Sequence, residues 1–292
     1  MEVDRELDKL RVQIGWLQSR AAVSAADPRE AEFRVFSQFG EDGIIQHLTN
    51  RVPIKNDVFV EFGVEDYSES NTRFLLVKDN WRGLIIDADD AHREFLRRSE
   101  LDWRHQIDAV TAFIDRDNIN SLITEAGIEG DIGLLSVDLD GNDYWVLEAI
   151  DAVSPRILIV EYNSVFGPEA AITIPYDPGF ARSKANSTWL YWGASLAALT
   201  RLADSKGYAL VAGNTAGNNA FFVRRDVAGD VTELSVARAY SPSRFRESRG
   251  KKGELTHVSD HRDRLELIRD EPVWDVEAGR ELTIGERLGL GS

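Results

Sequence analysis

The sequence predicts an α/β protein with a doubly wound, mainly parallel, seven-stranded sheet that ends in an antiparallel hairpin and carries extensions at both ends of the chain. Two observations predict this fold. Strand and helix patterns alternate from Val58 onward, and such alternation is typical of a parallel sheet with helices on both faces. After residue 206, two apolar strands flank a turn that begins and ends in glycine, which is the pattern of a hairpin.

Apolar periodicity and turn residues place each element in order. Residues 2–20 predict an amphipathic helix that either packs on the domain or pairs with a second copy of the chain, and residues 21–30 read as a linker. The segment SQFGEDGII at 37–45 opens a second helix, with Ser37 or Asp42 as its cap. Further strands are predicted at 58–62, 83–87, 106–110, 132–138, 156–161, 208–212 and 219–223. Helices are predicted between them at 70–79, 90–99, 117–126, 142–150 and 194–206.

Three parts follow from this pattern: an N-terminal helix and linker (1–34), the α/β domain (35–226) and a C-terminal extension (227–292). Residues 163–190 contain Gly167-Pro168 and Pro178-Gly179 and are too long for an ordinary connection, which predicts a lid or substrate loop. The extension is polar and mixed in charge, and its pattern predicts no particular element.

Composition excludes several classes of function. The formal net charge of -16 and the pI of about 4.8 lack the basic footprint of a general nucleic-acid binder. The chain has no cysteine, so it forms neither disulfides nor thiolate metal sites, which fits a cytoplasmic protein. No apolar run approaches the roughly 20 residues of a membrane span. We therefore expect a small molecule or a glycan as the partner.

The turn after the first strand predicts the kind of cofactor. In DVFVEFGVEDYSESN (57–71), Gly63 stands alone where a dinucleotide needs G-x-G-x-x-G to approach a pyrophosphate. The acids Glu61, Glu65 and Asp66 repel phosphate and suit a cofactor with a positive centre and no phosphate, such as S-adenosylmethionine. Asp87, at the end of the next strand, is placed to accept hydrogen bonds from ribose hydroxyls.

Polar side chains also gather at the ends of the predicted strands 132–138 and 156–161. Asp138 and Asp140 follow one, Glu161 and Asn163 end the other, and these strands lie side by side in a doubly wound sheet. Four oxygen ligands suit Mg²⁺, which could hold substrate oxygens and lower a hydroxyl pKa. Without a metal, we expect Asp140 as a base or Asp138 against the methionine part of the cofactor, with the other acids capping helices. Both versions remain open at this point.

Taken together and in order, SQFGEDGII, VFVEFGVED, GLIIDAD, SVDLDGNDYWVLEAI, ILIVEYN and GNNAFFV resemble FkbM-type methyltransferases over roughly residues 35–225. These enzymes have the Rossmann-like class I methyltransferase fold, use S-adenosylmethionine and often act on hydroxyls of sugars and secondary metabolites. The resemblance implies an O-methyltransferase whose cofactor contacts are Gln38, Glu61, Gly63, Asp87 and Asp138. It departs from the family where Glu65 replaces a second glycine and where Asp138-Leu139-Asp140-Gly141 replaces the usual acid-Val-Glu-Gly.

Other classes compete for the same acids. The segment DLDGN at 138–142 resembles the nucleophile strand of haloacid-dehalogenase-type phosphatases, although that strand normally opens its fold and three strand-helix units precede it here. The pair Asp138 and Asp140 also matches the D-x-D of nucleotide-sugar glycosyltransferases. A methyltransferase-like module that binds a ligand without catalysis is the remaining alternative.

Overall fold

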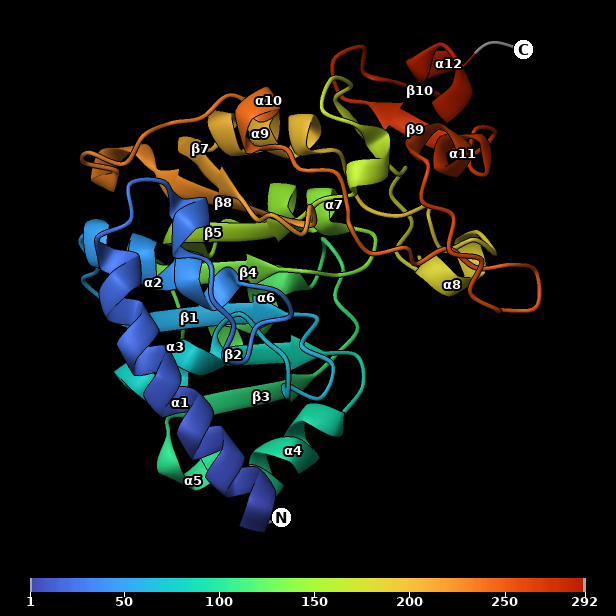
Figure 1. The fold of residues 1–292 in the computed structure, drawn as a ribbon. Coiled ribbons are helices and arrows are strands. Elements are labelled where there is room, and N and C mark those ends of the chain that lie inside the picture. Colours follow the sequence, from blue (N-terminus) through green and yellow to red (C-terminus); the bar gives the residue numbers. More distant parts are fainter. Residues whose placement is uncertain (1, 291–292) are drawn as a thin grey trace.

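The structure, a computed structural model, describes residues 2–290 and confirms the predicted fold class. Its main sheet has the strand order β3-β2-β1-β4-β5-β8-β7, in which β8 runs antiparallel to both of its neighbours, β5 and β7, and the other strands all run in one direction (Figure 1). The strands are β1 (Val58–Phe62), β2 (Arg82–Asp87), β3 (Ile107–Thr111), β4 (Gly130–Val137), β5 (Val153–Glu161), β7 (Tyr208–Gly213) and β8 (Asn219–Arg224).

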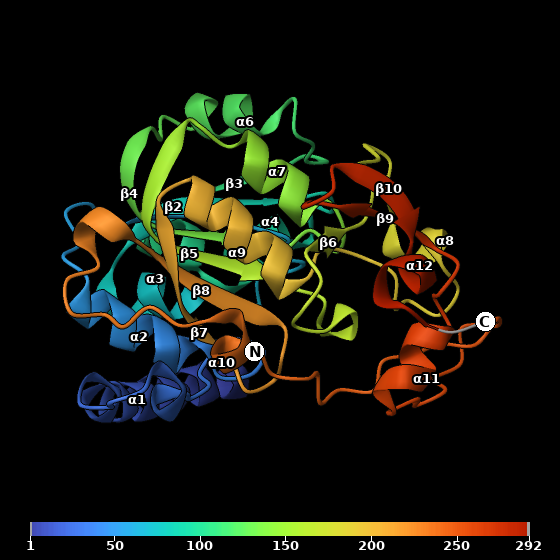
Figure 2. The ribbon, with the colours of Figure 1, turned by 90° about the horizontal axis from the view of Figure 1, so that it is seen from above.

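Helices cover both faces of this sheet because successive side chains of a strand point to opposite faces. On β1, Val58, Val60 and Phe62 join one buried core, whereas Phe59 joins the other. The first core packs under α6 (Ile119–Glu125), α7 (Asp143–Ala149) and α9 (Leu196–Ser205). The second core packs under α2 (Glu41–Arg51), α3 (Arg73–Asp79), α4 (Ala91–Ser99) and α5 (Leu101–Arg104). Figure 2 shows the two layers on opposite sides of the strands.

The N-terminal helix α1 (Glu2–Val23) lies against α2 and α3. Gly15 makes the close approach to α3 possible, since a Cβ there would lie 2.7 Å from Cζ of Phe74. The segment after α1, which the sequence predicts as a linker, contains a 3-10 helix at Pro28–Ala31 capped by Asp27.

The cap of the second helix differs from the prediction. Helix α2 begins at Glu41, and its N-cap Gly40 makes no side-chain hydrogen bond. Asp42 is instead buried inside the first turn, where its Oδ2 accepts the backbone N–H groups of Val35, Phe36 and Ser37. Burial raises the pKa of Asp42 to about 6 although these hydrogen bonds oppose the shift. The SQFGED segment is thus folded around Asp42 and is not a simple helix start.

The predicted lid and the part of the C-terminal extension from residue 261 onward form one unit, which we call the C-terminal module, whereas Leu234 and Ala239 of the extension join the core of the main domain. It contains an antiparallel sheet in the order β10-β9-β6, with β6 (Ile172–Thr173) from the lid and β9 (Pro272–Asp275) and β10 (Arg280–Thr283) from the extension. Its own apolar core joins lid residues such as Phe166 and Ile174 to Val273. The helices that remain are α8 (Arg182–Ala185), α10 (Val236–Ala239), α11 (His261–Glu266) and α12 (Ile284–Leu288).

The module lies beyond the carboxyl ends of the parallel strands, next to the edge where ligands bind in open α/β sheets (Figures 1 and 2). Among residues 2–290, no helix is long and apolar enough to cross a membrane.

Candidate functional site

Gly63 sets the shape of the crevice at the end of β1. It has a left-handed φ of 68°, and its N–H donates to the carbonyl of Ile86 at 3.1 Å. A Cβ on this residue would lie only 1.7 Å from the backbone oxygen of Asp138. The turn therefore packs directly against the chain that leaves β4, and only glycine fits between the two strand ends.

Asp87 anchors the same turn from β2. Its Oδ2 accepts the N–H of Glu65 at 2.8 Å, and its Oδ1 accepts the N–H of Asp89 at 2.9 Å. Each carboxylate oxygen retains a lone pair that can accept a ribose hydroxyl. Glu65, which replaces the expected second glycine, has a left-handed φ of 48°, so the glycine-type backbone is kept without the glycine.

The electrostatic potential in this crevice is negative. The pKa of Glu65 is raised by burial and then by the charges of Asp140, Asp66, Asp87 and Glu69. Carboxylates from the loops after β1, β2 and β4 therefore act on one another at this edge. Such a field disfavours a phosphate and favours a cationic sulfonium.

Glu61 is turned toward the protein. It is 4% exposed, and its carboxylate accepts the backbone N–H groups of Asn71 and Thr72 and the Thr72 hydroxyl, at the start of α3. Burial raises the pKa of Glu61 to about 7, against the opposing effect of these hydrogen bonds. Its contacts fix the loop that follows Gly63, and a direct contact with a cofactor stays a prediction.

The acidic loop after β4 is held by Asp143 and covered by the lid. Asp143 is fully buried and accepts the N–H groups of Leu139 and Gly141. A Cβ on Gly141 would lie 2.2 Å from the Phe180 ring, and the Asn142 amide donates to the carbonyl of Asp177 at 2.7 Å. Asn142 is the N-cap of α7 by position, but its side chain makes no capping bond.

Arg182 on α8 bridges the lid to the acidic loop. Its guanidinium donates to Asp140 Oδ1 at 2.8 Å, to Glu247 Oε2 at 3.3 Å and to the carbonyl of Trp189. Burial lowers the Arg182 pKa, but Asp140 and Glu161 outweigh burial and raise it. Arg182 therefore stays charged and is the cation that faces the acids.

Asp138, half-buried just after β4, and Glu161, buried at the end of β5, form a carboxyl pair because these two strands pair in parallel. Burial raises the pKa of both groups and the neighbouring carboxylates raise it further, while Arg182 and, for Asp138, a hydrogen bond with Glu161 offset only part of the rise. Glu161 is 8% exposed, and its Oε2 has no hydrogen-bond partner among the described residues. The pair retains a proton at higher pH than ordinary carboxyl groups do, and one oxygen remains free for a ligand.

Asn163 and Gln38 do not take part in the Asp138–Glu161 pair. The Asn163 amide donates to the carbonyls of Leu190 and Trp192, and its Oδ1 accepts the N–H of Val165. Gln38 is exposed and lines a groove with Phe39, Thr215 and other residues of the segments next to the β7–β8 turn.

The four predicted metal ligands do not present their oxygens to one point. Asp140 is paired with Arg182, Asp138 with Glu161, and the oxygen of Asn163 caps a turn. In the part of the chain from residue 2 to 290, no group of three or more His, Asp or Glu side chains is arranged to hold a metal ion. The residues therefore do not fit Mg²⁺ as they stand.

Sequence reasoning missed Arg182 and Asp143. Arg182 lies in a segment without a motif, and only the folding of the lid onto the loop after β4 brings it to the acids. Asp143 is the last acid of the DLDGND motif, so the sequence marks it as a residue of interest. The sequence does not show that its carboxylate accepts hydrogen bonds from Leu139 and Gly141 in the preceding loop.

Comparisons with known proteins give the fold and little more. No protein-family model matches the chain, and no curated protein matches it. Among solved structures it is similar to TrmK from M. capricolum in complex with S-adenosyl-homocysteine (10% identity, 69% of this chain and 76% of that chain, TM-score 0.38). It is also similar to an O-methyltransferase from Bacillus cereus in complex with S-adenosyl-homocysteine (15%, 73% and 88%, TM-score 0.39) and to an O-methyltransferase family protein from Burkholderia thailandensis (11%, 76% and 59%, TM-score 0.39).

TM-scores and sequence identities this low carry no argument about the activity of this chain. The fold class follows from the order and direction of the strands instead. The parallel strands β3-β2-β1-β4-β5, followed by the reversed strand β8 and then by β7, which again runs parallel to the first five, define the class I S-adenosylmethionine-dependent methyltransferase fold. The sequence prediction of that fold class is confirmed.

Proposed function

We propose that the chain is an S-adenosylmethionine-dependent O-methyltransferase that acts on a hydroxyl of a sugar, glycoconjugate or secondary metabolite. The observation that carries this proposal is the carboxyl pair of half-buried Asp138 and buried Glu161 beside the crevice of a class I methyltransferase fold. The resemblance of the ordered motifs to FkbM-type enzymes supports a sugar-like acceptor.

The residues of the crevice suit this cofactor. Asp87 would hold the ribose, and the glycine turn at residue 63 would let the cofactor approach the strand ends. The negative field around Glu65 would favour the positive sulfur. When bound, S-adenosylmethionine supplies an already activated methyl group.

The acceptor hydroxyl needs an acceptor for its proton, and the acid pair would provide it. A general base works best when its pKa lies near the working pH, and burial has raised the pKa values of Asp138 and Glu161 in that direction. The free Oε2 of Glu161 can receive the proton, which the pair then shares. Arg182 would stabilise the negative charge of the pair, while the lid, held by Phe180 on Gly141, limits access of water.

Asp140 is a weaker candidate for the base than the sequence suggests, because its carboxylate is already bound by Arg182. The same ion pair disfavours the phosphatase and glycosyltransferase hypotheses, which need Asp138 and Asp140 to face one metal together. The non-catalytic module remains an outcome of the test.

Calorimetry with S-adenosylmethionine and S-adenosylhomocysteine tests the proposal directly. We expect binding of both at protein concentrations near 100 μM, a threshold of roughly −5 kcal/mol. Release of S-adenosylhomocysteine over a panel of hydroxylated sugars then tests turnover, with EDTA and added Mg²⁺ as paired controls. Absence of binding by either compound would refute the proposal, and binding without turnover on any acceptor would favour the non-catalytic module.

A further inference from the structure

An open groove with a volume of about 280 Å³ lies between three segments that are far apart in the sequence. These are residues 32–39 before α2, the turn between β7 and β8, and residues 244–245 of the extension. The volume is close to the lower end of the roughly 300–1,000 Å³ of small-molecule sites. It suits a ligand of about one ring with a substituent.

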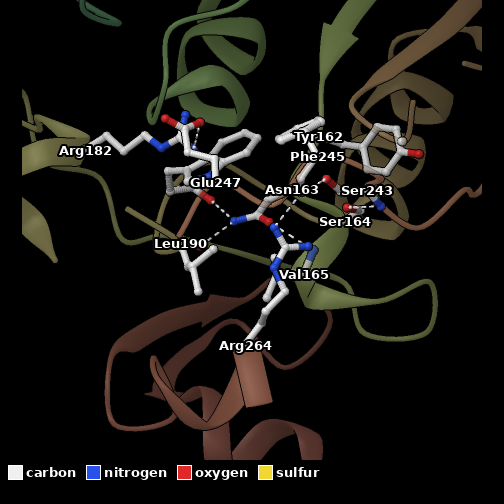
Figure 3. Close-up of a pocket in the computed structure, with 12 residues that line it drawn as sticks. Tyr162, Asn163, Ser164, Val165, Arg182, Leu190, Ser243, Phe245, Glu247 and Arg264 are labelled. Carbon is white, nitrogen blue, oxygen red and sulfur yellow. Dashed lines mark hydrogen bonds and ion pairs between the residues drawn. The ribbon is translucent and has the colours of Figure 1, made fainter. Parts of the chain in front are cut away.

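The groove borders the elements that form the crevice. Arg34 in its wall forms an ion pair with Glu69, which lies in the loop after β1. Phe245 on its other side also lines a small pocket that contains Arg182 and Glu247, so the groove ends next to the cation that faces the acids (Figure 3).

Hydrogen bonds also join the groove to the end of β5. The carboxylate of Glu41 accepts the N–H of Phe39 at 2.9 Å and the side-chain amide of Asn219 at 3.1 Å. Asn219 begins β8 and is paired with Glu161 in the sheet. The groove therefore lies at the same sheet edge as the acid pair, about one strand further along.

The walls of the groove are formed without a ligand. The carboxylate of Glu32 accepts the N–H and the hydroxyl of Thr215, both at 2.6 Å. The rings of Phe39 and Phe245 stack, with centroids 5.6 Å apart and planes 9° from parallel. The N–H of Arg244 donates to a carbonyl of the β7–β8 turn at 3.3 Å. Three segments are thus held in place around one aromatic surface.

The polar groups that remain free in the groove suit an anion. Glu32 is engaged by the β7–β8 turn and Arg34 by Glu69, but the exposed side chains of Gln38 and Arg244 make no hydrogen bond or ion pair within residues 2–290. Residues 243–253 carry five basic side chains and one acidic side chain, in a chain with a net charge of -16. This local positive charge complements an anionic ligand.

We propose that the groove binds the methyl acceptor, and that the acceptor is an anionic sugar whose charged group is held by Arg244. The inference rests on the proposed function and names the class of acceptor. The acids of the crevice repel an anion, so the charged end binds at Arg244 and the neutral hydroxyls extend toward Asp138 and Glu161. The charge of the acceptor thus selects which hydroxyl reaches the acid pair.

Each free group has a part in this recognition. A guanidinium matches a carboxylate or a phosphate through two parallel N–H bonds, which Arg244 has available. The amide of Gln38 can donate to one hydroxyl and accept from another. Phe39, 37% exposed and stacked on Phe245, offers apolar surface to the carbon face of a sugar ring.

The test measures the binding of glucuronate and glucose 6-phosphate, with neutral glucose as the control, by ligand-observed NMR at constant ionic strength and without cofactor. The proteins are the wild type, Arg244→Gln and Arg246→Gln, the last being a matched loss of charge at an exposed residue of the same segment that does not line the groove. We expect the wild type and Arg246→Gln to bind an anionic sugar about three- to tenfold more tightly than glucose. Arg244→Gln should lose this preference.

Preference for glucuronate alone would support a carboxylate as the charged group, and preference for glucose 6-phosphate alone would support a phosphate. No preference over glucose in the wild type, or an equal loss in both variants, would overturn the inference. If Arg244→Gln does not fold, Arg244→Lys keeps the charge without the planar fork and should bind the anionic sugar about threefold more weakly. An unchanged affinity would again overturn it.

Turnover provides a second readout. With a sugar that is methylated, Arg244→Gln should raise KM and leave kcat unchanged, because Arg244 holds the acceptor away from the reacting hydroxyl. A lower kcat with an unchanged KM would contradict this placement. Binding of S-adenosylmethionine is measured separately, and its absence in the wild type would refute the proposed function and leave the result for sugar binding standing.

Discussion

Gly63→Ala tests the link between the glycine turn and the acid strand. The new Cβ would be 1.7 Å from Asp138 O, so the ends of β1 and β4 must separate by more than about 1 Å. A left-handed φ costs an L-residue about 1–2 kcal/mol, and overpacking costs about 1–3 kcal/mol more. We therefore expect a loss of about 2–5 kcal/mol in the free energy of unfolding.

Gly127→Ala is the matched control, because Gly127 also has a left-handed φ (70°) but no atom within 4 Å of its Cβ position. It should show the conformational cost alone. Urea unfolding of both variants isolates the steric part, which we expect at about 1–3 kcal/mol. Calorimetry with S-adenosylmethionine should show weaker binding by Gly63→Ala and wild-type binding by Gly127→Ala.

The reasoning fails if Gly63→Ala costs no more stability than Gly127→Ala. In that case, the turn would adapt without moving β4, and the close packing of cofactor turn and acid strand would have no functional weight.

Three further predictions concern the carboxylates. Asp87→Ala should weaken S-adenosylmethionine binding about ten- to a hundredfold in calorimetry, from the loss of charged hydrogen bonds, with the fold retained; unchanged affinity would remove the ribose role from this residue. Glu61→Gln should flatten the dependence of stability on pH. Unfolded Glu61 releases its proton near pH 4.5 and folded Glu61 near pH 7, so its contribution is greatest below pH 4.5 and is lost as the pH rises through this window. Urea unfolding at pH 5 and pH 8 measures this, and an equal slope in variant and wild type would contradict it. Glu161→Gln should bind the cofactor normally and lower turnover by about 10²–10⁴-fold, and near-normal turnover would exclude Glu161 as part of the base.

Most of the main sheet could be predicted from the sequence because its strands are short apolar runs that end in acids or glycines. The pattern of alternation located β1 to β5 and the final hairpin, and short-range signals suffice for such elements. The cap of α2 was missed because Asp42 binds residues that precede it in the chain, which resembles an N-cap in sequence but not in geometry.

The site was predictable only as far as strand ends determine it. Asp138 and Glu161 come together because β4 and β5 are neighbours, which the topology implies. Arg182 and Arg244 reach their places through lid and extension segments without periodicity, and β6 pairs with β9 across about a hundred residues. Such long-range pairing leaves no local signal, so the charges opposite the acids could not be placed from the sequence.

The pairing of β6 with β9 has a consequence for how the chain becomes functional during synthesis. The seven strands that frame the proposed cofactor crevice are complete by residue 224, but the lid gains its partner strands only when residues 272–283 leave the ribosome. Until then the acid pair stands open to water. A nascent chain without residues 272–283 would thus present a finished crevice and an unfinished lid, so these residues decide when the site closes.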